Sequence, residues 1–312
     1  MLGLSIPAPL GYFLCLVALF STLGRLFPVL RFVWVWIGGR KAKGRYGKDS
    51  WAVVTGASSE LGAEFCEELA KEGYNLVLIA RGEQELRRTA STLEATYQVQ
   101  TRVLVWSAAD HSSTLETFYS GLCSQMEDLD VSMLINLLSI TEDGFYSEQP
   151  LELIVKTLDL NVWPSLLLTR WAIGKMSRRK TRSAIINFAS MSALYPYAGM
   201  SLHSASMKFV DFLSQSIHNE LRLFPELPLD LLTVQPSGLR SRASAPSPNQ
   251  VSASSCVSGV LRNLGRSPYT AGAFKHSILS AFTSLFPESF KASLIVQRIK
   301  RSKPALPRAD NR

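Results

Sequence analysis

The stretch 51-WAVVTGASSELGAEFCEELAKEGYNLVLIAR-81 decides the fold. It begins with a β-branched run that ends in Gly56, which is typical of a buried parallel strand. Apolar residues at Phe65 and Leu69, separated by charges and followed by Gly73, indicate a helix and its end. The run NLVLIA is a second buried strand. Strand, glycine turn, helix and strand within about 30 residues predict a dinucleotide-binding βαβ unit.

The turn of this unit favours a phosphate-bearing cofactor, because it brings a helix N-terminus and bare backbone amides toward a pyrophosphate. Arg81 follows the second strand. An acidic residue at that place would bind a ribose 2′-hydroxyl, whereas an arginine accepts a 2′-phosphate. The sequence therefore predicts NADP(H) rather than NAD(H). A βαβ unit that only packs is the alternative that two glycines by themselves leave open.

Composition narrows the class of protein further. The chain has 312 residues, enough for one large domain with appendages, and a formal net charge of +8. A basic balance suits an anionic cofactor or an anionic membrane. The sequence shows no zinc-finger spacing and no RNA-binding motif, so we expect no nucleic-acid partner. Its four cysteines are scattered without a C-x-x-C pair, so we expect neither a metal site nor a disulfide framework.

The N-terminal segment has the character of a membrane anchor. Residues 8–24 carry no charge, apolar residues resume after Arg25, and a basic run follows from Arg40 to Lys48. A spanning helix needs about 20 apolar residues, which this stretch reaches if Arg25 snorkels. A cleaved signal peptide is the alternative, but no positive segment precedes the apolar core. We expect a retained anchor with the basic run on the cytoplasmic side.

The turn TGASSELG resembles the T-G-x-x-x-G-x-G loop of the short-chain dehydrogenase/reductase superfamily. Thr55, Gly56 and Gly62 match, whereas Glu60 stands at the middle glycine. A carboxylate there opposes a pyrophosphate by about 1–4 kcal/mol, so we expect weakened NADP(H) binding. The cofactor contacts that the resemblance implies are Thr55, Gly56, Ser58, Ser59, Leu61, Gly62, Arg81, Asn136, Pro236 and Gly238.

Two further stretches are similar to one branch of that superfamily. They are the entry 46-YGKDSWAVVTGAS-58 and the ending 268-PYTAGAFKHSILSAFTSLFPESF-290. The branch is that of the endoplasmic reticulum, with the 17-beta-hydroxysteroid dehydrogenases types 3 and 12 and the very-long-chain 3-ketoacyl-CoA reductases. The resemblance implies NADPH-dependent reduction of a ketone on a lipid, either a 3-oxoacyl-CoA or a steroid.

The predicted organisation has three parts. Residues 1–45 form the membrane anchor and basic step, residues 46–275 a Rossmann-type domain with a doubly wound parallel α/β sheet, and residues 276–312 an amphipathic helix and basic tail. The resemblance implies an endoplasmic-reticulum membrane location with the main domain facing the cytosol. It also implies a lipid or steroid substrate, and a homodimer or a fatty-acid elongation complex as assembly.

The same resemblance assigns the catalytic positions. Ser190 lies thirteen positions before His203, which is the family's spacing between its catalytic Ser and Tyr. Asn161 matches the family's helix Asn, which helps to hold a proton-relay water. The family's Tyr-x-x-x-Lys pair reads His203 and Met207 in this chain. Lys208 is one position too late to share a helix face with His203.

These replacements bear on the chemistry. Hydride transfer to a ketone leaves an alkoxide, and the family protonates it with a Tyr whose pKa is lowered by the Lys. Met207 cannot assist. His203 has an ordinary pKa of about 6.5 and can donate a proton in principle, but it is equally a histidine satisfied by structural hydrogen bonds. Losing one preorganised donor typically costs about 100-fold in rate. The residues favour an impaired family member; family membership alone favours an active reductase.

The tail leaves two interpretations open. Its apolar positions fit one stripe of a helix and are followed by a basic cluster. They are Ile278, Leu279, Phe282, Leu285 and Phe286. Contact with a membrane surface is one interpretation. A helix that covers the domain or mediates a dimer is the other.

Overall fold

The computed structural model describes residues 9, 12–17, 19–20, 36, 44–106, 115–240, 250–284 and 286–302. The chain divides into two compact units, Met1–Lys41 and Ala42–Arg312. In the first unit, the described residues are mostly helical and exposed. No helix among the described residues is both long enough and apolar enough to cross a bilayer. Most of the anchor predicted over residues 1–45 lies outside the described residues.

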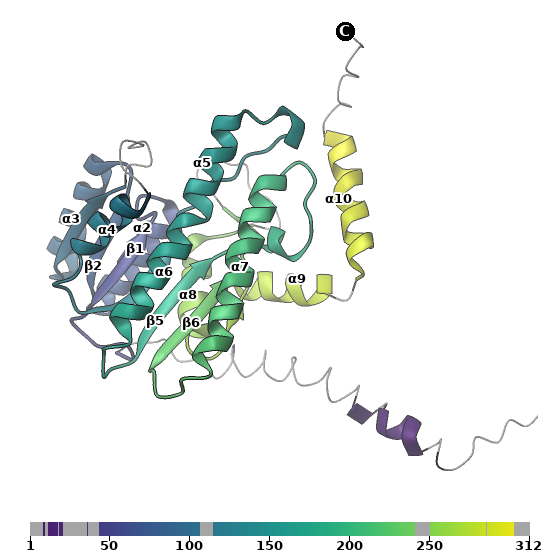
Figure 1. Ribbon diagram of the computed structural model, residues 1–312, viewed down its shortest axis with the longest axis horizontal. Coiled ribbons are helices and arrows are strands. Elements are labelled where there is room, and N and C mark those ends of the chain that lie inside the picture. The colour runs from purple at the N-terminus through teal and green to yellow at the C-terminus, as the bar shows by residue number, and fades with distance from the viewer. Residues whose placement is uncertain are drawn as a thin grey trace, which may run out of the picture. The chain divides into compact units, whose positions relative to one another are not determined.

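The second unit is built on a parallel sheet (Figure 1). Within the described part of the chain, its seven strands run in the order β3-β2-β1-β4-β5-β6-β9. Their bounds are β1 Trp51–Thr55, β2 Asn75–Ala80, β3 Thr101–Val105, β4 Val131–Asn136, β5 Ser183–Phe188, β6 Leu229–Val234 and β9 Tyr269–Thr270. A short ribbon pairs β7 Gly238–Leu239 with β8 Gln250–Val251. From β1 the strand order runs to one side through β2 and β3 and then continues on the other side with β4. The carboxyl ends of β1 and β4, where the order changes direction, form the usual ligand-binding edge of such folds.

Helices cover both faces of the sheet, which confirms the predicted doubly wound α/β fold. One layer consists of α2 Glu60–Lys71, α3 Glu83–Tyr97 and α8 Ala253–Asn263. The other consists of α4 Leu115–Ser124, α5 Leu151–Asn161, α6 Trp163–Met176 and α7 Ser201–Leu221. Neighbouring residues of β1 show why the strands are apolar throughout. Val53 packs in the core of the second layer and Val54 in that of the first, and both are fully buried.

The predicted C-terminal helix is two helices, α9 Phe274–Ser284 and α10 Glu288–Ser302. Two short 3-10 helices complete the described elements, η1 Tyr146–Glu148 and η2 Met191–Leu194. Ile278, Leu279 and Phe282 of the stripe predicted for the tail lie on α9, Phe286 follows that helix, and a break before Glu288 separates the two helices. Pro287 explains this break, because a proline lacks the N–H that would continue α9. Leu285 of that stripe lies outside the described residues.

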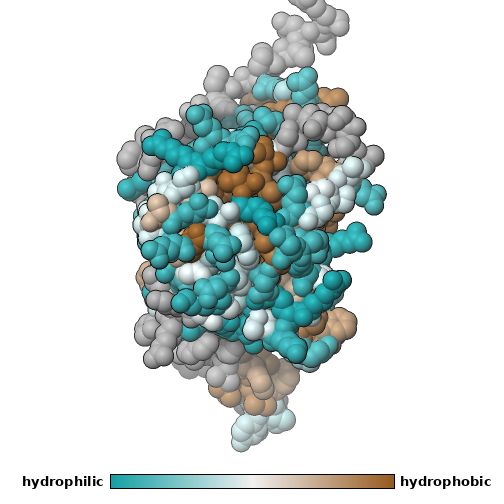
Figure 2. Space-filling view, turned by 90° about the vertical axis from the view of Figure 1, so that its left-hand side faces the viewer, coloured by the Kyte–Doolittle hydropathy of each residue, from teal (hydrophilic) through white to brown (hydrophobic). Residues whose placement is uncertain are grey.

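The side of the domain at the β3 edge of the sheet is mostly hydrophilic (Figure 2). Two ion pairs belong to this region. Arg87 and Glu83 pair along α3 at 2.6 Å, and Arg102 of β3 pairs with Asp128 at 2.8 Å. Such exposed pairs contribute little to stability, so their main consequence is a solvated surface.

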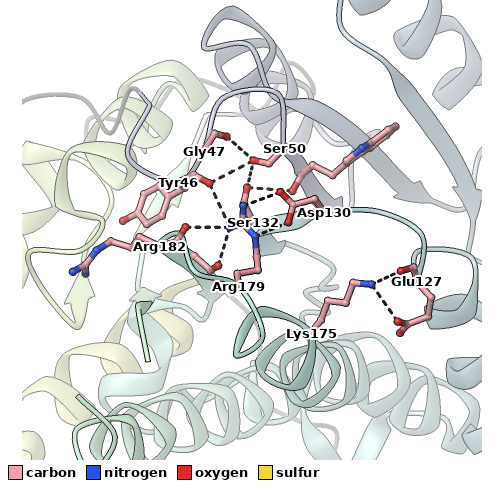
Figure 3. A network of polar contacts seen from close by, with 11 residues as sticks. Tyr46, Gly47, Ser50, Glu127, Asp130, Ser132, Lys175, Arg179 and Arg182 are labelled. Carbon is pink, nitrogen blue, oxygen red and sulfur yellow. Dashed lines mark hydrogen bonds and ion pairs between the residues drawn. The ribbon is translucent and has the colours of Figure 1, made fainter. Parts of the chain in front are cut away.

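A polar network fixes the segment that enters β1 to the amino edge of the sheet, away from the ligand edge (Figure 3). The buried Tyr46 hydroxyl donates to Asp230 at 2.9 Å, and Arg182 donates to the same carboxylate at 2.9 Å. Arg179 binds Asp130 with two bonds of 2.7 and 3.0 Å and also reaches the Tyr46 carbonyl. Burial and the Asp230 carboxylate raise the pKa of Tyr46, so its phenol stays protonated. The entry segment is thus tied to the starts of β4 and β6.

Candidate active site

The turn after β1 is built for close approach of a helix. Gly56 has φ +68°, a left-handed conformation that glycine adopts without strain. Ser59 caps α2: its hydroxyl donates to the Gly56 carbonyl at 2.8 Å and accepts from the Gly62 amide at 3.0 Å. A Cβ at Gly62 would lie 2.8 Å from Ala57 Cα and closer still to the Gly56 carbonyl oxygen. The first turn of α2 therefore rests directly on the loop.

Two charged residues stand beside this turn. Glu60 is the first residue of α2 and is exposed, so its carboxylate lies at the positive end of the helix dipole. Arg81 is exposed and follows β2, which pairs with β1 up to Thr55 and Ile79. Of the remaining predicted turn contacts, Ser58 and Leu61 are half-buried. One anion-repelling and one anion-attracting group thus lie at the same edge of the sheet.

Thr55 ties the loop after β4 to β1. Its buried hydroxyl accepts from the amides of Leu137 and Leu138 at 2.9 and 3.3 Å. Both leucines are half-buried and pack against the hydrophobic cores, Leu137 on one face and Leu138 on the other. The leucines that replace the expected glycine-containing motif therefore serve packing.

Asn136 lies inside a polar network in the core. Its amide nitrogen donates to Asn187 at 2.8 Å and to Thr169 at 3.3 Å, and Asn187 in turn donates to Ser214 at 3.0 Å. These residues cross-link β4, β5, α6 and α7. The side-chain oxygen of Asn136, Oδ1, is buried and has no hydrogen-bond partner among the described residues. A direct role of Asn136 toward a cofactor stays a prediction.

Asn161 binds both backbone groups of Ile140, the N–H and the C=O. Its carbonyl oxygen accepts from the Ile140 amide at 2.7 Å, and its amide nitrogen donates to the Ile140 carbonyl at 3.0 Å. The same nitrogen donates to Ser206 of α7 at 2.9 Å. Asn161 is the last residue of α5 and is buried. It therefore holds the loop after β4 against both α5 and α7.

His203 shares the Ile140 carbonyl with Asn161. Its Nδ1 lies 3.1 Å from the Ile140 carbonyl oxygen and 3.3 Å from the Thr141 hydroxyl. A carbonyl only accepts, so Nδ1 carries the proton and Nε2 is the unprotonated nitrogen of the neutral ring. The residue is 7% exposed, and burial lowers its pKa despite opposing effects of the Ile140 carbonyl and Asp143. At neutral pH, His203 therefore has no proton on Nε2 to donate.

The lowered pKa of His203 predicts a pH effect on stability. The unfolded chain protonates this ring near its ordinary value of 6.5, whereas the folded chain protonates it only at lower pH. Stability is therefore complete above 6.5 and is lost as the pH falls through 6.5 toward the folded value. We expect the free energy of unfolding to fall more steeply in the wild type than in His203→Gln between about pH 7 and pH 5. Urea titrations across this range measure it; parallel pH dependences would contradict it.

Neither Met207, at the family's lysine position, nor the next residue, Lys208, places a positive charge beside His203. Met207 is buried one turn further along α7. Lys208 is exposed and pairs with Asp211 at 3.3 Å. The buried Asp211 carboxylate also accepts from Gln235 at 2.7 Å. The positive charge of Lys208 is thus held on another side of α7, in agreement with the helical geometry.

Ser190 follows β5 and caps η2, with its hydroxyl oxygen accepting from the Ser192 amide at 3.2 Å. The segment after β6 lies beside it, because the Met191 amide donates to the Pro236 carbonyl at 2.9 Å. Gly238 begins β7 two residues later. The ends of β5 and β6 therefore place Ser190 beside the Pro236–Gly238 segment.

Two residues of this site were missed by sequence reasoning. Ile140 acts through its backbone, which leaves no side-chain signal. His276 of α9 is fully buried, and its Nδ1 accepts from the Ser237 amide at 3.3 Å. A lone histidine in the tail is a signal, but nothing in its spacing points to Ser237. Among the described residues, no cluster of His, Cys, Asp and Glu could hold a metal ion.

The fold and these motifs define a class of protein. A family model described as short chain dehydrogenase matches residues 50–247, and the chain belongs to this family. The very-long-chain 3-oxoacyl-CoA reductase of Rattus norvegicus is 27% identical over 298 residues, covering 91% of this chain and 93% of that protein. The reductase of the same name from Meyerozyma guilliermondii is 31% identical over 257 residues, covering 74% of this chain and 73% of that protein.

A solved structure shares the fold. The short-chain dehydrogenase from Sphingobium yanoikuyae in complex with NADPH superposes with a TM-score of 0.65 and 23% sequence identity. The match covers 84% of this chain and 98% of that one. The chain is thus related in sequence to reductases of 3-oxoacyl-CoA, and its fold is one that holds NADPH in another protein.

Proposed function

We propose that this chain is a membrane-associated relative of NADPH-dependent 3-oxoacyl-CoA or 17-ketosteroid reductases in which turnover is impaired. One observation carries the proposal: the group at the catalytic tyrosine position is a neutral histidine bonded to the Ile140 carbonyl, with buried Met207 at the lysine position. The site keeps the framework of a reductase. It lacks the acid that completes the reaction.

The chain's own residues divide by what they can still do. Bound NADPH would supply the hydride. Ser190 keeps a hydroxyl hydrogen with which to polarise a substrate carbonyl oxygen, since its capping bond uses only the oxygen. Asn161 keeps the Ile140 loop in place. The alkoxide that hydride transfer creates finds no protonated donor at His203, so the step that fails is proton delivery.

The cofactor site fits NADP(H) in part. The left-handed Gly56 and the contact of Gly62 with the loop preserve the phosphate turn, and exposed Arg81 suits a 2′-phosphate. Glu60 opposes this fit, because its carboxylate occupies the helix end that attracts phosphate. We infer weakened but specific NADP(H) binding.

A charge-only substitution tests this inference. Glu60→Gln is expected to tighten NADPH binding by about tenfold, because it removes the repulsion of the pyrophosphate. Fluorescence titration of the detergent-solubilised full chain measures the dissociation constant. Glu64→Gln, one turn further along α2, is the matched control and should change affinity by less than about twofold. Equal effects of the two substitutions would argue against a specific role of Glu60.

An active ketone reductase is the second candidate, favoured by the retained Ser190 and Asn161. Steady-state NADPH oxidation with a 3-oxoacyl-CoA or a 17-ketosteroid separates the two candidates. For an impaired site we expect wild type and Ser190→Ala to match the protein-free rate. A wild-type rate that falls about 100-fold in Ser190→Ala would establish the active reductase instead.

We infer an endoplasmic-reticulum membrane location with residues 46–275 facing the cytosol. The charge-free residues 8–24, the basic run after them and the relatives' coverage of most of the chain support it. A homodimer or a fatty-acid elongation complex is the assembly we expect there. Protease treatment of sealed microsomes tests the topology, since a cytosol-facing domain is digested without detergent.

A further inference from the structure

The C-terminal helices present a regular row of large apolar side chains. Every fourth residue from 278 to 294 belongs to it: Ile278, Phe282, Phe286, Phe290 and Leu294. A spacing of four keeps residues on one stripe of a helix. The row continues across the break between α9 and α10, because the centre of the Phe286 ring lies 5.2 Å from the ring centre of Phe282 and 5.3 Å from that of Phe290. We call these five residues the apolar row.

The apolar row faces away from the domain. Ile278, Phe282, Phe290 and Leu294 are 46–59% exposed, which is high for large apolar side chains that adjoin one another. The opposite side of the two helices is tied to the domain. His276 of α9 and Ile295 of α10 are buried. The helices are therefore held by one side and leave the apolar row open on the other.

Charge indicates what covers the apolar row. Residues 274–302 contain five basic residues and one acid, Glu288. The basic ones are Lys275, Lys291, Arg298, Lys300 and Arg301. This net positive charge complements an anionic surface and would repel a second copy of the same segment. Helices that are apolar on one face and basic elsewhere lie in the membrane interface, with the apolar face about 5–10 Å deep.

We propose that the apolar row inserts into the surface of a membrane that contains anionic lipids. This membrane-contact site is separate from the N-terminal apolar segment. It deepens the proposed membrane location, on which it rests, by naming the surface of the folded domain that contacts lipid.

Helix α10 also contacts the segment between β5 and α7, which contains Ser190. The Lys291 ammonium lies 5.2 Å from the ring centre of Tyr195, five residues after Ser190. Figure 1 shows α10 beside the loop that joins β5 to α7. Seating α9 and α10 on a membrane would therefore bring the Ser190 loop close to the lipid surface. A substrate with a long acyl chain or a steroid skeleton would reach Ser190 from that surface.

Single fluorophores on the apolar row test the proposal in the full chain reconstituted into vesicles. The background carries Cys15→Ser and Cys123→Ser, since Cys66 and Cys256 are buried. An environment-sensitive thiol probe is placed at Phe282→Cys, at Phe290→Cys, or at Leu223→Cys. Leu223 is the matched control: it is exposed and apolar and follows α7, away from the apolar row. The vesicles contain phosphatidylcholine with or without phosphatidylserine, and spin-labelled lipid is the quencher.

We expect spin-labelled lipid to quench the probes at 282 and 290 at least about twofold, and more strongly with phosphatidylserine, while the probe at 223 is unchanged. Quenching at 282 and 290 no greater than at 223 would overturn the proposal. Probes shielded from aqueous iodide but not quenched by lipid would overturn it too, in favour of a second copy. The readout does not depend on NADPH, so a protein that fails to bind cofactor can still show lipid contact.

Discussion

The double variant His203→Tyr, Met207→Lys is expected to reduce a 3-oxoacyl-CoA with NADPH at least about 100-fold faster than the wild type. The tyrosine supplies the missing proton, and the lysine one turn away lowers its pKa. The loop loses the His203 bond to Ile140 but keeps both bonds from Asn161. The local framework should therefore survive the change.

Three control variants show whether the gain in rate comes from proton delivery. His203→Tyr alone should gain little, because no ammonium lowers the phenol's pKa. His203→Phe, Met207→Lys keeps the ring size of the double variant without its hydroxyl and should stay at the wild-type rate. Removing Ser190 from the double variant should abolish the gain. A double variant no faster than an already active wild type would refute impaired proton delivery.

The second large effect concerns stability. Gly62→Ala is expected to lower the free energy of unfolding by about 3 kcal/mol, because the added Cβ meets backbone rather than a movable side chain. That Cβ would lie 2.8 Å from Ala57 Cα and 2.9 Å from the Gly56 carbonyl carbon. Relief requires α2 to move away from the turn, which should also weaken NADPH binding.

Gly174→Ala is the matched control for this substitution. Gly174 lies within α6, and a Cβ there meets nothing within 4 Å. Alanine should therefore raise stability by about 0.5–1 kcal/mol through its better helix propensity. Urea unfolding of both variants in the same detergent measures the difference. Equal stabilities of the two variants would mean that α2 does not rest on the turn as described.

The parts of the fold that follow from periodicity could be predicted. Alternation of strand and helix in residues 51–81 predicted β1, α2 and β2, because buried parallel strands and amphipathic helices leave distinct patterns. The assignment of the site to Ser190 and His203 rests on the family's spacing rather than on periodicity, and it stays a prediction.

What could not be predicted depends on contacts between distant segments. The Ile140 peptide is held by Asn161 and His203 through backbone atoms that are the same in every residue. The protonation of His203 follows from that partner, so the sequence left its role open. The Tyr46 bond to Asp230 joins residues 184 positions apart, and no periodicity records it.

The network at Tyr46 also has a mechanical consequence. A force applied to the chain ahead of residue 44 first reaches Tyr46. The Tyr46 phenol is bonded to Asp230 at the start of β6, and its carbonyl is bonded to Arg179, which pairs with Asp130 just before β4. The starts of β4 and β6 therefore share the force through Asp130 and Asp230. Only after these bonds break would β1 carry the force by itself. Traction from a membrane-held N-terminus would stretch several bonds in parallel rather than unzip one strand. The carboxyl edge, with its loops and its chemistry, would be shielded from that force.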